Sequence, residues 1–216
     1  MKRIWIMSLM SVVLAGLAAC GPLQQDRLTF GAVRGMVAGG ADESPAPSPP
    51  LTRAFIEAQP VDLLRISIIS RGAAGLTSLA GRNGGKVTWI GEEGIGFVFD
   101  NGLLIGTRGL GDDLMGADVS GAIRSLNGGG NHLRTLDFMN GLDQIERLTF
   151  RCATAATGSE TITIFERSYA TTVIEERCRG DIGTFTNTYW RDGSGTIWQS
   201  RQWISLDVGY LGYQRL

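Results

Sequence analysis

The sequence predicts a mainly β protein: an antiparallel meander forming a sandwich or a partly open barrel, with one or two short helices. Three observations carry this prediction. Glycine accounts for 31 of the 216 residues and proline for only 6, which favours short strands and tight turns over long helices. From residue 61 onward the apolar residues recur mainly with period two. Turn-forming residues interrupt this pattern about every 8–12 residues, as is typical of antiparallel all-β folds.

The N-terminus has the features of a bacterial lipoprotein signal. A short positive segment precedes an uncharged apolar run over 4–14, which is too short to span a bilayer. The next segment, 17–20, reads Leu-Ala-Ala-Cys and resembles a lipobox, in which the cysteine receives diacylglycerol and the chain is cut before it. We therefore expect 1–19 to be a signal peptide and Cys20 to carry the acyl chains that anchor the protein.

A lipidated tether is expected to follow over residues 20–50. Four prolines within 45–50 stiffen it towards the polyproline II conformation, so it spaces the folded part from the bilayer. The residues after the cysteine are Gly21 and Pro22. Under the enterobacterial sorting rule, the lack of an aspartate there favours the outer membrane, with the body on the periplasmic face. The rival interpretation is a soluble secreted protein with a chance cysteine.

A single β domain is expected over 51–216, and it opens with a short helix. Thr52 is suited to cap this helix and Pro60 ends it. The pair Asn101-Gly102 is a strong hairpin signal between two of the strands that follow. The strands expected in this first half cover 61–70, 73–81 (strand or turn), 86–90, 95–99 and 103–108.

The middle of the domain, 109–130, is the least regular part. It contains a turn at 109–115, a short helix within 118–126 and a flexible glycine-rich break at 127–130. The later strands are expected at 134–138, 147–152, 161–166, 172–178, 184–190, 196–204 and 208–213. Trp198 and Trp203 fall on opposite faces of their strand, and at least two of the four tryptophans after the signal peptide are expected in the core.

Cys152 and Cys178 are expected to form a disulfide. An exported chain enters an oxidising compartment, where an even pair of cysteines normally bridges. Both residues lie on expected strands, so the bond would join neighbouring strands. In the chain-entropy model, a loop of this length contributes about 3–4 kcal/mol. The rival interpretation, a reactive thiol pair, lacks the C-x-x-C spacing.

Several function classes are disfavoured by composition. The formal net charge is −1 and no basic patch is present, so nucleic acid is not an expected partner. One histidine and three cysteines do not suffice for a multi-ligand metal site. The glycine-rich runs lack the spacing of a nucleotide-binding loop, so no cofactor is expected. His132 lies in the glycine-rich break and is expected to be solvated, although any Ser-His-Asp site would have to use it.

Candidate contact residues lie in two places, the turn at 109–115 and the C-terminal third, which is rich in Trp, Tyr and Arg. Adjacent aspartates point apart in an extended chain, so catalysis by such a pair is not expected and turn formation is favoured. Exposed aromatic and arginine side chains suit either a glycan or a protein partner. The candidates for contact with a glycan or a partner are Arg108, Asp112, Asp113, Trp190, Arg201 and Trp203.

The sequence resembles the YjbF family of bacterial lipoproteins, which includes capsule lipoproteins of the GfcB and YmcC kind. The lipobox and the later cysteine pair fit this group, and the resemblance covers roughly 51–216. The stretches that carry it are 107–115 (Thr-Arg-Gly-Leu-Gly-Asp-Asp-Leu-Met), Ala117-Asp118, Tyr189-Trp190, 197–204 (Ile-Trp-Gln-Ser-Arg-Gln-Trp-Ile) and Gly209-Tyr210.

This resemblance implies a mainly antiparallel β fold and a role in making or exporting an exopolysaccharide or group 4 capsule. It implies outer-membrane β-barrel proteins of the YjbH/GfcD type as partners, and it brings no catalytic residues. We therefore expect a non-enzymatic lipoprotein that docks to such a barrel, with the polysaccharide as a further contact. The rival functions are a glycan-binding module and a glycan-modifying enzyme that uses Asp112 or Asp113.

Overall fold

A computed structural model describes residues 51–216, which form one compact unit. The expected signal peptide, the lipidation site Cys20 and the tether lie outside the described residues. The helices are α1 (Arg53–Glu57) and α2 (Ser120–Ser125), and single 3-10 turns cover Ile69–Arg71 and Glu92–Gly94. The strands are β1 (Leu63–Ile68), β2 (Ala73–Asn83), β3 (Lys86–Ile90), β4 (Gly96–Asp100), β5 (Leu103–Arg108), β6 (Gly116–Asp118), β7 (Gly130–Met139), β8 (Ile145–Ile164), β9 (Arg167–Gly180), β10 (Gly183–Arg191), β11 (Ile197–Ser205) and β12 (Gly209–Arg215).

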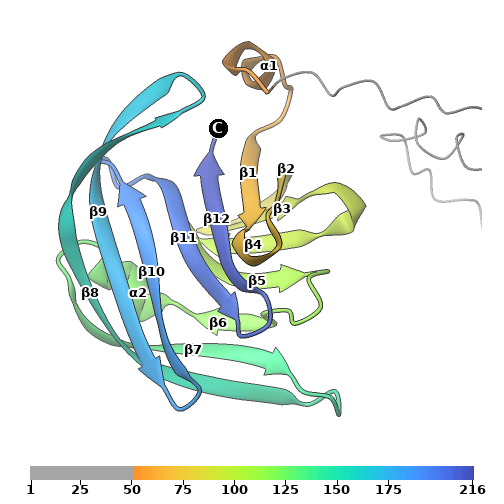
Figure 1. Cartoon of the computed structure of the whole chain (residues 1–216), viewed down its shortest axis with the longest axis vertical. Coiled ribbons are helices and arrows are strands. Elements are labelled where there is room, and N and C mark those ends of the chain that lie inside the picture. Colours follow the sequence, from red (N-terminus) through yellow and green to blue (C-terminus); the bar gives the residue numbers. More distant parts are fainter. Residues whose placement is uncertain (1–50) are drawn as a thin grey trace, which may run out of the picture. The chain divides into compact units, whose positions relative to one another are not determined.

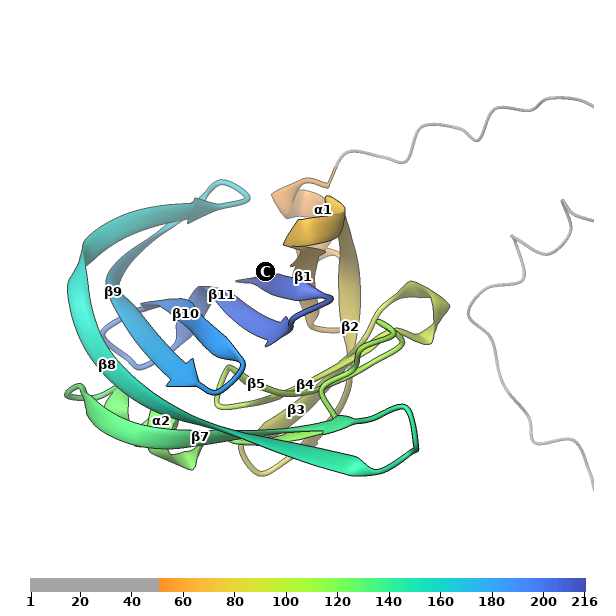
Figure 2. The ribbon, with the colours of Figure 1, turned by 60° about the horizontal axis from the view of Figure 1, so that its bottom comes forward.

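These strands form one twelve-stranded sheet in the order β5-β4-β3-β2-β1-β12-β11-β10-β9-β8-β7-β6, and each pair of hydrogen-bonded neighbours is antiparallel (Figure 1). Every neighbouring pair is consecutive in sequence except β1 and β12, which join the first and last strands. The sheet curls (Figure 2) until its two edge strands, β5 and β6, lie side by side (Figure 1). There the amide of Thr107 at the end of β5 donates to the carbonyl of Leu114, 2.9 Å away, just before β6. The fold is thus a nearly closed barrel, which confirms the expected partly open barrel.

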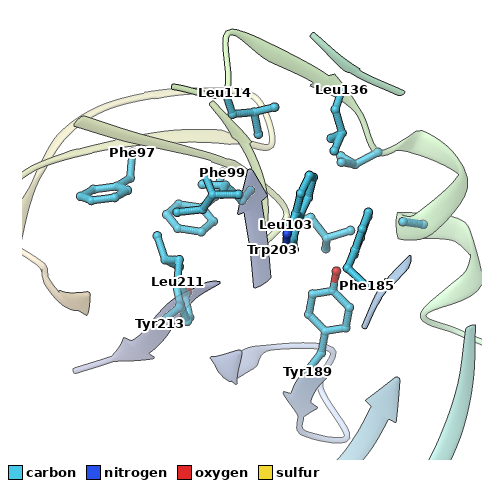
Figure 3. Close-up of a cluster of buried hydrophobic side chains, with 14 of the residues drawn as sticks. Phe97, Phe99, Leu103, Leu114, Leu136, Phe185, Tyr189, Trp203, Leu211 and Tyr213 are labelled. Carbon is cyan, nitrogen blue, oxygen red and sulfur yellow. The ribbon is translucent and has the colours of Figure 1, made fainter. Parts of the chain in front are cut away.

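The core fills the concave side of the sheet (Figure 3). Trp203 is central to it, because its ring stacks on Phe185 at 4.7 Å and meets Phe150 edge-on at 6.0 Å. Trp89 is also buried, so two of the four tryptophans lie in the core, as expected. No helix within 51–216 has the length and hydrophobicity needed to cross a membrane.

The helix α1 holds the tip of the long β8–β9 hairpin. Thr52 caps it as expected, since its hydroxyl accepts from the amide of Phe55 at 3.2 Å. The guanidinium of Arg53 then donates to the carbonyls of Ile164 and Phe165, at 2.7 and 2.9 Å. These bonds tie the helix to the hairpin turn.

Two expected strands, 147–152 and 161–166, are in fact parts of the single strand β8, and this prediction was wrong. The intervening residues are mostly small and show no alternation of large apolar side chains, yet pairing with β9 keeps them extended. A register shift between Ala156 and Gly158 absorbs the irregularity. The chain reverses only at Phe165 and Glu166, where φ is 44° and 72°, so β9 begins at Arg167 instead of 172.

Candidate functional site

The turn between β5 and β6 carries the stretch with the strongest family resemblance. The carboxylate of Asp113 accepts from the amides of Gly109 and Leu110, at 2.8 and 3.1 Å, and from the hydroxyl of Thr107 at 2.7 Å. Gly109 and Gly111 adopt positive φ, while Leu110 and Leu114 are buried. Asp113 therefore fixes the turn, which is the structural role favoured from the sequence.

Two neighbouring loops are hydrogen-bonded to this turn. Arg71, after β1, donates to the carbonyl of Leu110 at 2.7 Å. Ser205, at the end of β11, donates to the carbonyl of Asp112 at 3.2 Å. We call the loops 69–72, 109–115 and 206–208 together the motif end of the barrel.

The motif end exposes two large aliphatic side chains. Ile69 and Leu206 are 48% and 68% exposed, which is unusual for large aliphatic side chains. Beside them lies a groove of about 430 Å³. Its apolar lining comes mainly from Ile66, Ile68, Leu76, Ile95, Phe97 and Leu110.

The other candidate contact residues are not all brought together. Arg108 is exposed at the motif end and donates to the carbonyl of Leu114 at 3.2 Å. Trp190 and Arg201 lie on the outer face of β10 and β11, at the side of the sheet opposite the core. Arg201 stacks on Tyr210, with the guanidinium carbon 3.3 Å from the ring centroid. Trp203 is 8% exposed in the core, so its assignment as a surface contact was wrong.

The outer face around Trp190 carries a polar row that crosses four strands. The pairing register places Arg65, Gln214, Gln199 and Trp190 opposite one another across β1, β12, β11 and β10. Arg65 donates to Gln214 at 3.1 Å, and Gln214 donates to Gln199 at 2.9 Å. The row is half-buried, and Trp190 at its end donates instead to the carboxylate of Glu160 on β8, 2.7 Å away.

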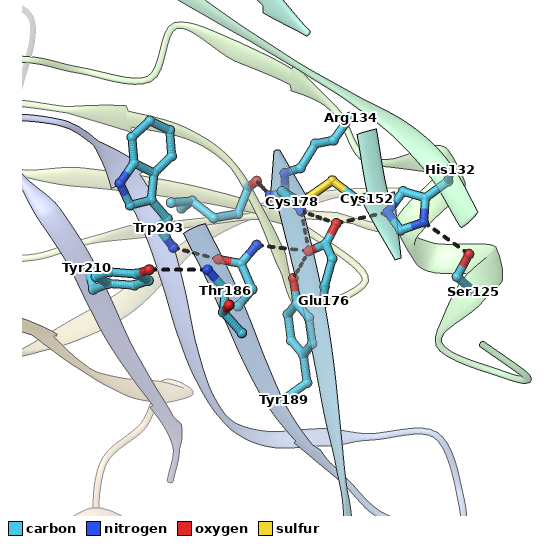
Figure 4. The surroundings of a disulfide bond; sticks show 12 residues. Ser125, His132, Arg134, Cys152, Glu176, Cys178, Thr186, Tyr189, Trp203 and Tyr210 are labelled. Atoms are coloured by element: carbon cyan, nitrogen blue, oxygen red, sulfur yellow. Dashed lines mark hydrogen bonds and ion pairs between the residues drawn. A yellow bond between two sulfur atoms is a disulfide. The ribbon is translucent and has the colours of Figure 1, made fainter. Parts of the chain in front are cut away.

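The interior holds a polar network around a fully buried carboxylate, Glu176 (Figure 4). It accepts from His132 Nε2 at 2.9 Å, from Arg134 at 3.0 Å, from Asn187 at 2.8 Å and from the hydroxyl of Tyr189 at 2.8 Å. Burial alone would raise the pKa of Glu176, but the Arg134 guanidinium and these hydrogen bonds lower it to about 2. Burial raises the pKa of Tyr189 well above its ordinary value, so its hydroxyl remains a donor.

His132 belongs to β7, not to a loop, and its side chain is only 5% exposed, so the expectation of a solvated histidine was wrong. The glycine-rich break ends earlier than its composition indicates, because Gly130 already pairs with Thr154 of β8. The sequence does place 132, 134 and 136 on one face of a strand, which could have indicated that they point inward. Two of these residues are polar, however, so the pattern did not indicate burial. The network was therefore not found from the sequence.

The disulfide Cys152–Cys178 lies beside this network and confirms the expected pairing (Figure 4). The two cysteines are direct cross-strand partners on β8 and β9, so the bond joins neighbouring strands as expected. Cys152, His132 and Glu176 together offer ligand types that metals use. The sulfur of Cys152 is committed to the disulfide, however, which leaves two donors, fewer than a zinc site needs.

The network also includes Ser125 of α2. The hydrogen-bonded series Ser125, His132, Glu176 has the order serine, histidine, acid of a hydrolase triad. Its hydroxyl lies 3.3 Å from His132 Nδ1, and His132 Nε2 lies 2.9 Å from Glu176. The same hydroxyl donates to the carbonyl of Gly121 at 3.0 Å, and the serine is buried. It also borders a cavity of about 530 Å³ between α2 and the strands β8 to β10.

These features define a nearly closed antiparallel β-barrel with a charged network in its interior and, at one end, a hydrogen-bonded turn beside two exposed aliphatic side chains. A solved structure shares this fold: the crystal structure of the hypothetical lipoprotein YmcC from Escherichia coli K12. It is 21% identical with a TM-score of 0.66, over 74% of this chain and 86% of that one. A search of curated proteins gave no match.

The chain belongs to the YjbF family. Residues 33–216 match the family model described as group 4 capsule polysaccharide lipoprotein gfcB, YjbF. This confirms the resemblance found in the sequence. The family consists of lipoproteins, which indicates a membrane-anchored location in the cell envelope, and membership supports a role in capsule or exopolysaccharide production.

Proposed function

We propose that the protein is a non-enzymatic lipoprotein that assists capsule or exopolysaccharide production or export by docking to an outer-membrane β-barrel protein. Acyl chains on Cys20 hold it at the periplasmic face of the outer membrane, and the proline-rich tether spaces the barrel from the lipid. The proposed partner is of the YjbH/GfcD type.

The motif end is the observation that carries this proposal. Ile69 and Leu206 expose apolar area next to a groove, and such area is removed from water when a partner covers it. The hydrogen bonds of Asp113 hold the 109–115 turn, and Arg71 and Ser205 bond the neighbouring loops to it. A rigid surface loses little conformational entropy on binding, so it suits a protein partner.

Co-purification from cell envelopes tests the docking. The full chain, tagged at its C-terminus because Cys20 must stay free, is extracted in mild detergent and its partners are identified by mass spectrometry. We expect an outer-membrane barrel protein to be recovered, and the double variant Ile69→Asp, Leu206→Asp to lose it. Both residues are exposed, so folding should persist, which a thermal melt of the purified variant checks.

The matched control is Leu142→Asp, which places the same charge on another exposed leucine, in the β7–β8 turn. It should recover the barrel protein at the wild-type level. Recovery by the double variant, or its loss from the control as well, contradicts docking through the motif end. Failure of the wild-type protein to recover any barrel protein contradicts the docking function itself.

A hydrolase is the second candidate, because Ser125, His132 and Glu176 stand in triad order beside a cavity. A serine nucleophile of this kind reacts covalently with fluorophosphonates. We expect the purified protein to remain unlabelled, since the Ser125 hydroxyl donates to Gly121. Labelling that disappears in Ser125→Ala would replace the non-enzymatic proposal with a hydrolase.

A further inference from the structure

A second cavity opens at the end of the barrel opposite the motif end. It has a volume of about 340 Å³, the lower end of the range for small-molecule sites. The β2–β3, β4–β5 and β10–β11 turns and the last residues of β12 surround it. The register pairs Arg215 of β12 with Leu64 of β1, so this is also the end at which α1 leads into the sheet (Figure 1).

Backbone forms much of the cavity wall, because each turn contributes glycine. A Cβ on Gly85 would lie 2.7 Å from the side chain of Asn101, and one on Gly102 would lie 3.0 Å from Ile197. Gly102 also has a φ of 84°, which side-chain-bearing residues rarely adopt. The turns therefore approach more closely than larger residues would permit, and peptide groups are left beside the cavity.

Two arginines, Arg82 and Arg215, line this cavity. Arg82 forms a pair with Asp62 at 2.7 Å, but both side chains are about half exposed, so the pair is weak and open to exchange. Arg215 has no carboxylate partner within residues 51–216. Its guanidinium carbon lies 6.0 Å from the ring centroid of Trp198. Burial raises the pKa of the Tyr213 hydroxyl, and the charges of Arg215 and Arg82 lower it.

Aromatic side chains complete the lining. Trp89, Phe99 and Tyr213 are all largely buried, and the rings of Phe99 and Tyr213 meet edge-on at 5.2 Å. Asn101, whose amide nitrogen donates to the Asp100 carboxylate at 2.8 Å, and Thr196 add hydrogen-bonding groups at the rim. An apolar wall, a few polar groups and the guanidinium of Arg215, which has no carboxylate partner within residues 51–216, complement a sugar ring that carries a carboxylate.

We propose that this cavity binds one carboxylate-bearing sugar residue of an acidic polysaccharide. Arg215 and Arg82 pair with the carboxylate, Asn101 and Thr196 bind hydroxyls, and the apolar wall contacts the C–H face of the ring. The inference rests on the proposed function in taking a polysaccharide as the ligand. It places ligand binding and partner docking at opposite ends of the barrel.

Calorimetry on the full chain in mild detergent tests the site. The probe is a tetrasaccharide of alternating glucuronate and N-acetylglucosamine, and its counterpart with the carboxylates reduced to alcohols is the matched ligand. We expect the acidic probe to bind at least tenfold more tightly than the reduced one. Arg215→Gln should remove this difference, because it deletes a charge-assisted bond.

Arg147→Gln is the control variant, since Arg147 is an exposed arginine paired with Asp137 on the far part of the sheet. It should bind both probes as the wild type does. Arg82→Gln, with a thermal melt, guards against a folding defect specific to Arg215→Gln. Equal binding of the two probes, no binding of either, or wild-type binding by both arginine variants overturns the site. Arg215→Gln should still recover the barrel protein, which separates failure of this site from failure of docking.

Discussion

A buried carboxylate stays ionised only where donors replace its water, and Glu176 receives hydrogen bonds from four side chains. Glu176→Gln removes the negative charge and leaves the Arg134 guanidinium buried without its counter-ion. We expect a loss of about 3–5 kcal/mol in the free energy of unfolding at pH 7, measured by urea denaturation. Asp137→Asn is the control, because the Asp137–Arg147 pair is exposed and its loss should cost less than about 1 kcal/mol.

The pH dependence of stability gives a second check on Glu176. Its pKa in the folded protein, about 2, lies below the ordinary value of 4.5. A carboxyl group with a lowered pKa stabilises the fold fully above its unfolded pKa and loses that contribution as the pH falls towards the folded value. The difference in unfolding free energy between wild type and Glu176→Gln should therefore shrink between pH 4.5 and about 2. Parallel curves over this range would contradict the prediction.

Asp112 and Asp113 are adjacent acids with different roles. Only the backbone carbonyl of Asp112 bonds to a neighbouring loop, whereas the carboxylate of Asp113 accepts three hydrogen bonds within the turn. We expect Asp113→Ala to lower the free energy of unfolding by about 1–3 kcal/mol. Asp112→Ala should change it by less than about 0.5 kcal/mol. Stability is measured by thermal and urea unfolding. If Asp113→Ala and Asp112→Ala lower it equally, the Asp113 carboxylate does not fix the turn.

The β8–β9 hairpin is held at one end by α1 and near the other by the disulfide. Cys152 and Cys178 lie 26 residues apart, and both are buried. The double variant Cys152→Ala, Cys178→Ala should lose about 3–4 kcal/mol of unfolding free energy, since the open chain gains entropy when unfolded. Reduction of the wild type under denaturing conditions, followed by refolding in reductant, should reproduce this loss. A loss below about 1 kcal/mol would contradict it.

Strands were predictable where apolar residues alternate and a turn signal ends them. Phe97 and Phe99 with the following Asn101-Gly102 predicted β4 and the hairpin to β5 correctly. The wrong predictions for the 153–159 segment and for His132 have one physical cause: contacts with residues distant in the sequence determine the structure there. The small residues of 153–159 are extended because β9 pairs with them, and His132 is buried because it bonds to Glu176, two strands away on β9. The tight turn formed by Asp113 was foreseen because its bonds are local.

The barrel is closed by interior polar bonds as well as by its sheet. Only one backbone bond, from Thr107 to Leu114, directly joins the end of β5 to the residues before β6. Inside, Arg134 of β7 donates to the carbonyl of Leu104 at 3.2 Å, and Gln202 of β11 accepts from the amide of Leu104 at 2.7 Å. Both polar groups of this β5 residue are thus bonded to strands far away in the sheet order. Apolar packing alone has no such directionality.

Gln202 tests whether this bracing holds the two parts of the curled sheet together. It is fully buried, and besides accepting from Leu104 it donates to the carbonyl of Gly102 at 2.9 Å. Gln202→Leu has a similar size but leaves both backbone groups unpaired, so we expect a loss of about 2–4 kcal/mol in unfolding free energy. Hydrogen exchange measured by mass spectrometry should rise mainly in peptides covering β4 and β5.

Gln199→Leu, on the outer face of the same strand, is the matched control, because Gln199 bonds only to Gln214 among the described residues. It should leave exchange in β4 and β5 unchanged. If Gln202→Leu raises exchange equally in every strand, the residue contributes to general stability and not to closure. If exchange rises only in β4 and β5 while β9 and β10 remain protected, the first strands form a unit that interior hydrogen bonds attach to the rest of the barrel. In that case the cavity at Arg215, which β2 to β5 wall on one side, should lose affinity for the acidic probe in Gln202→Leu although no residue touching the sugar has changed.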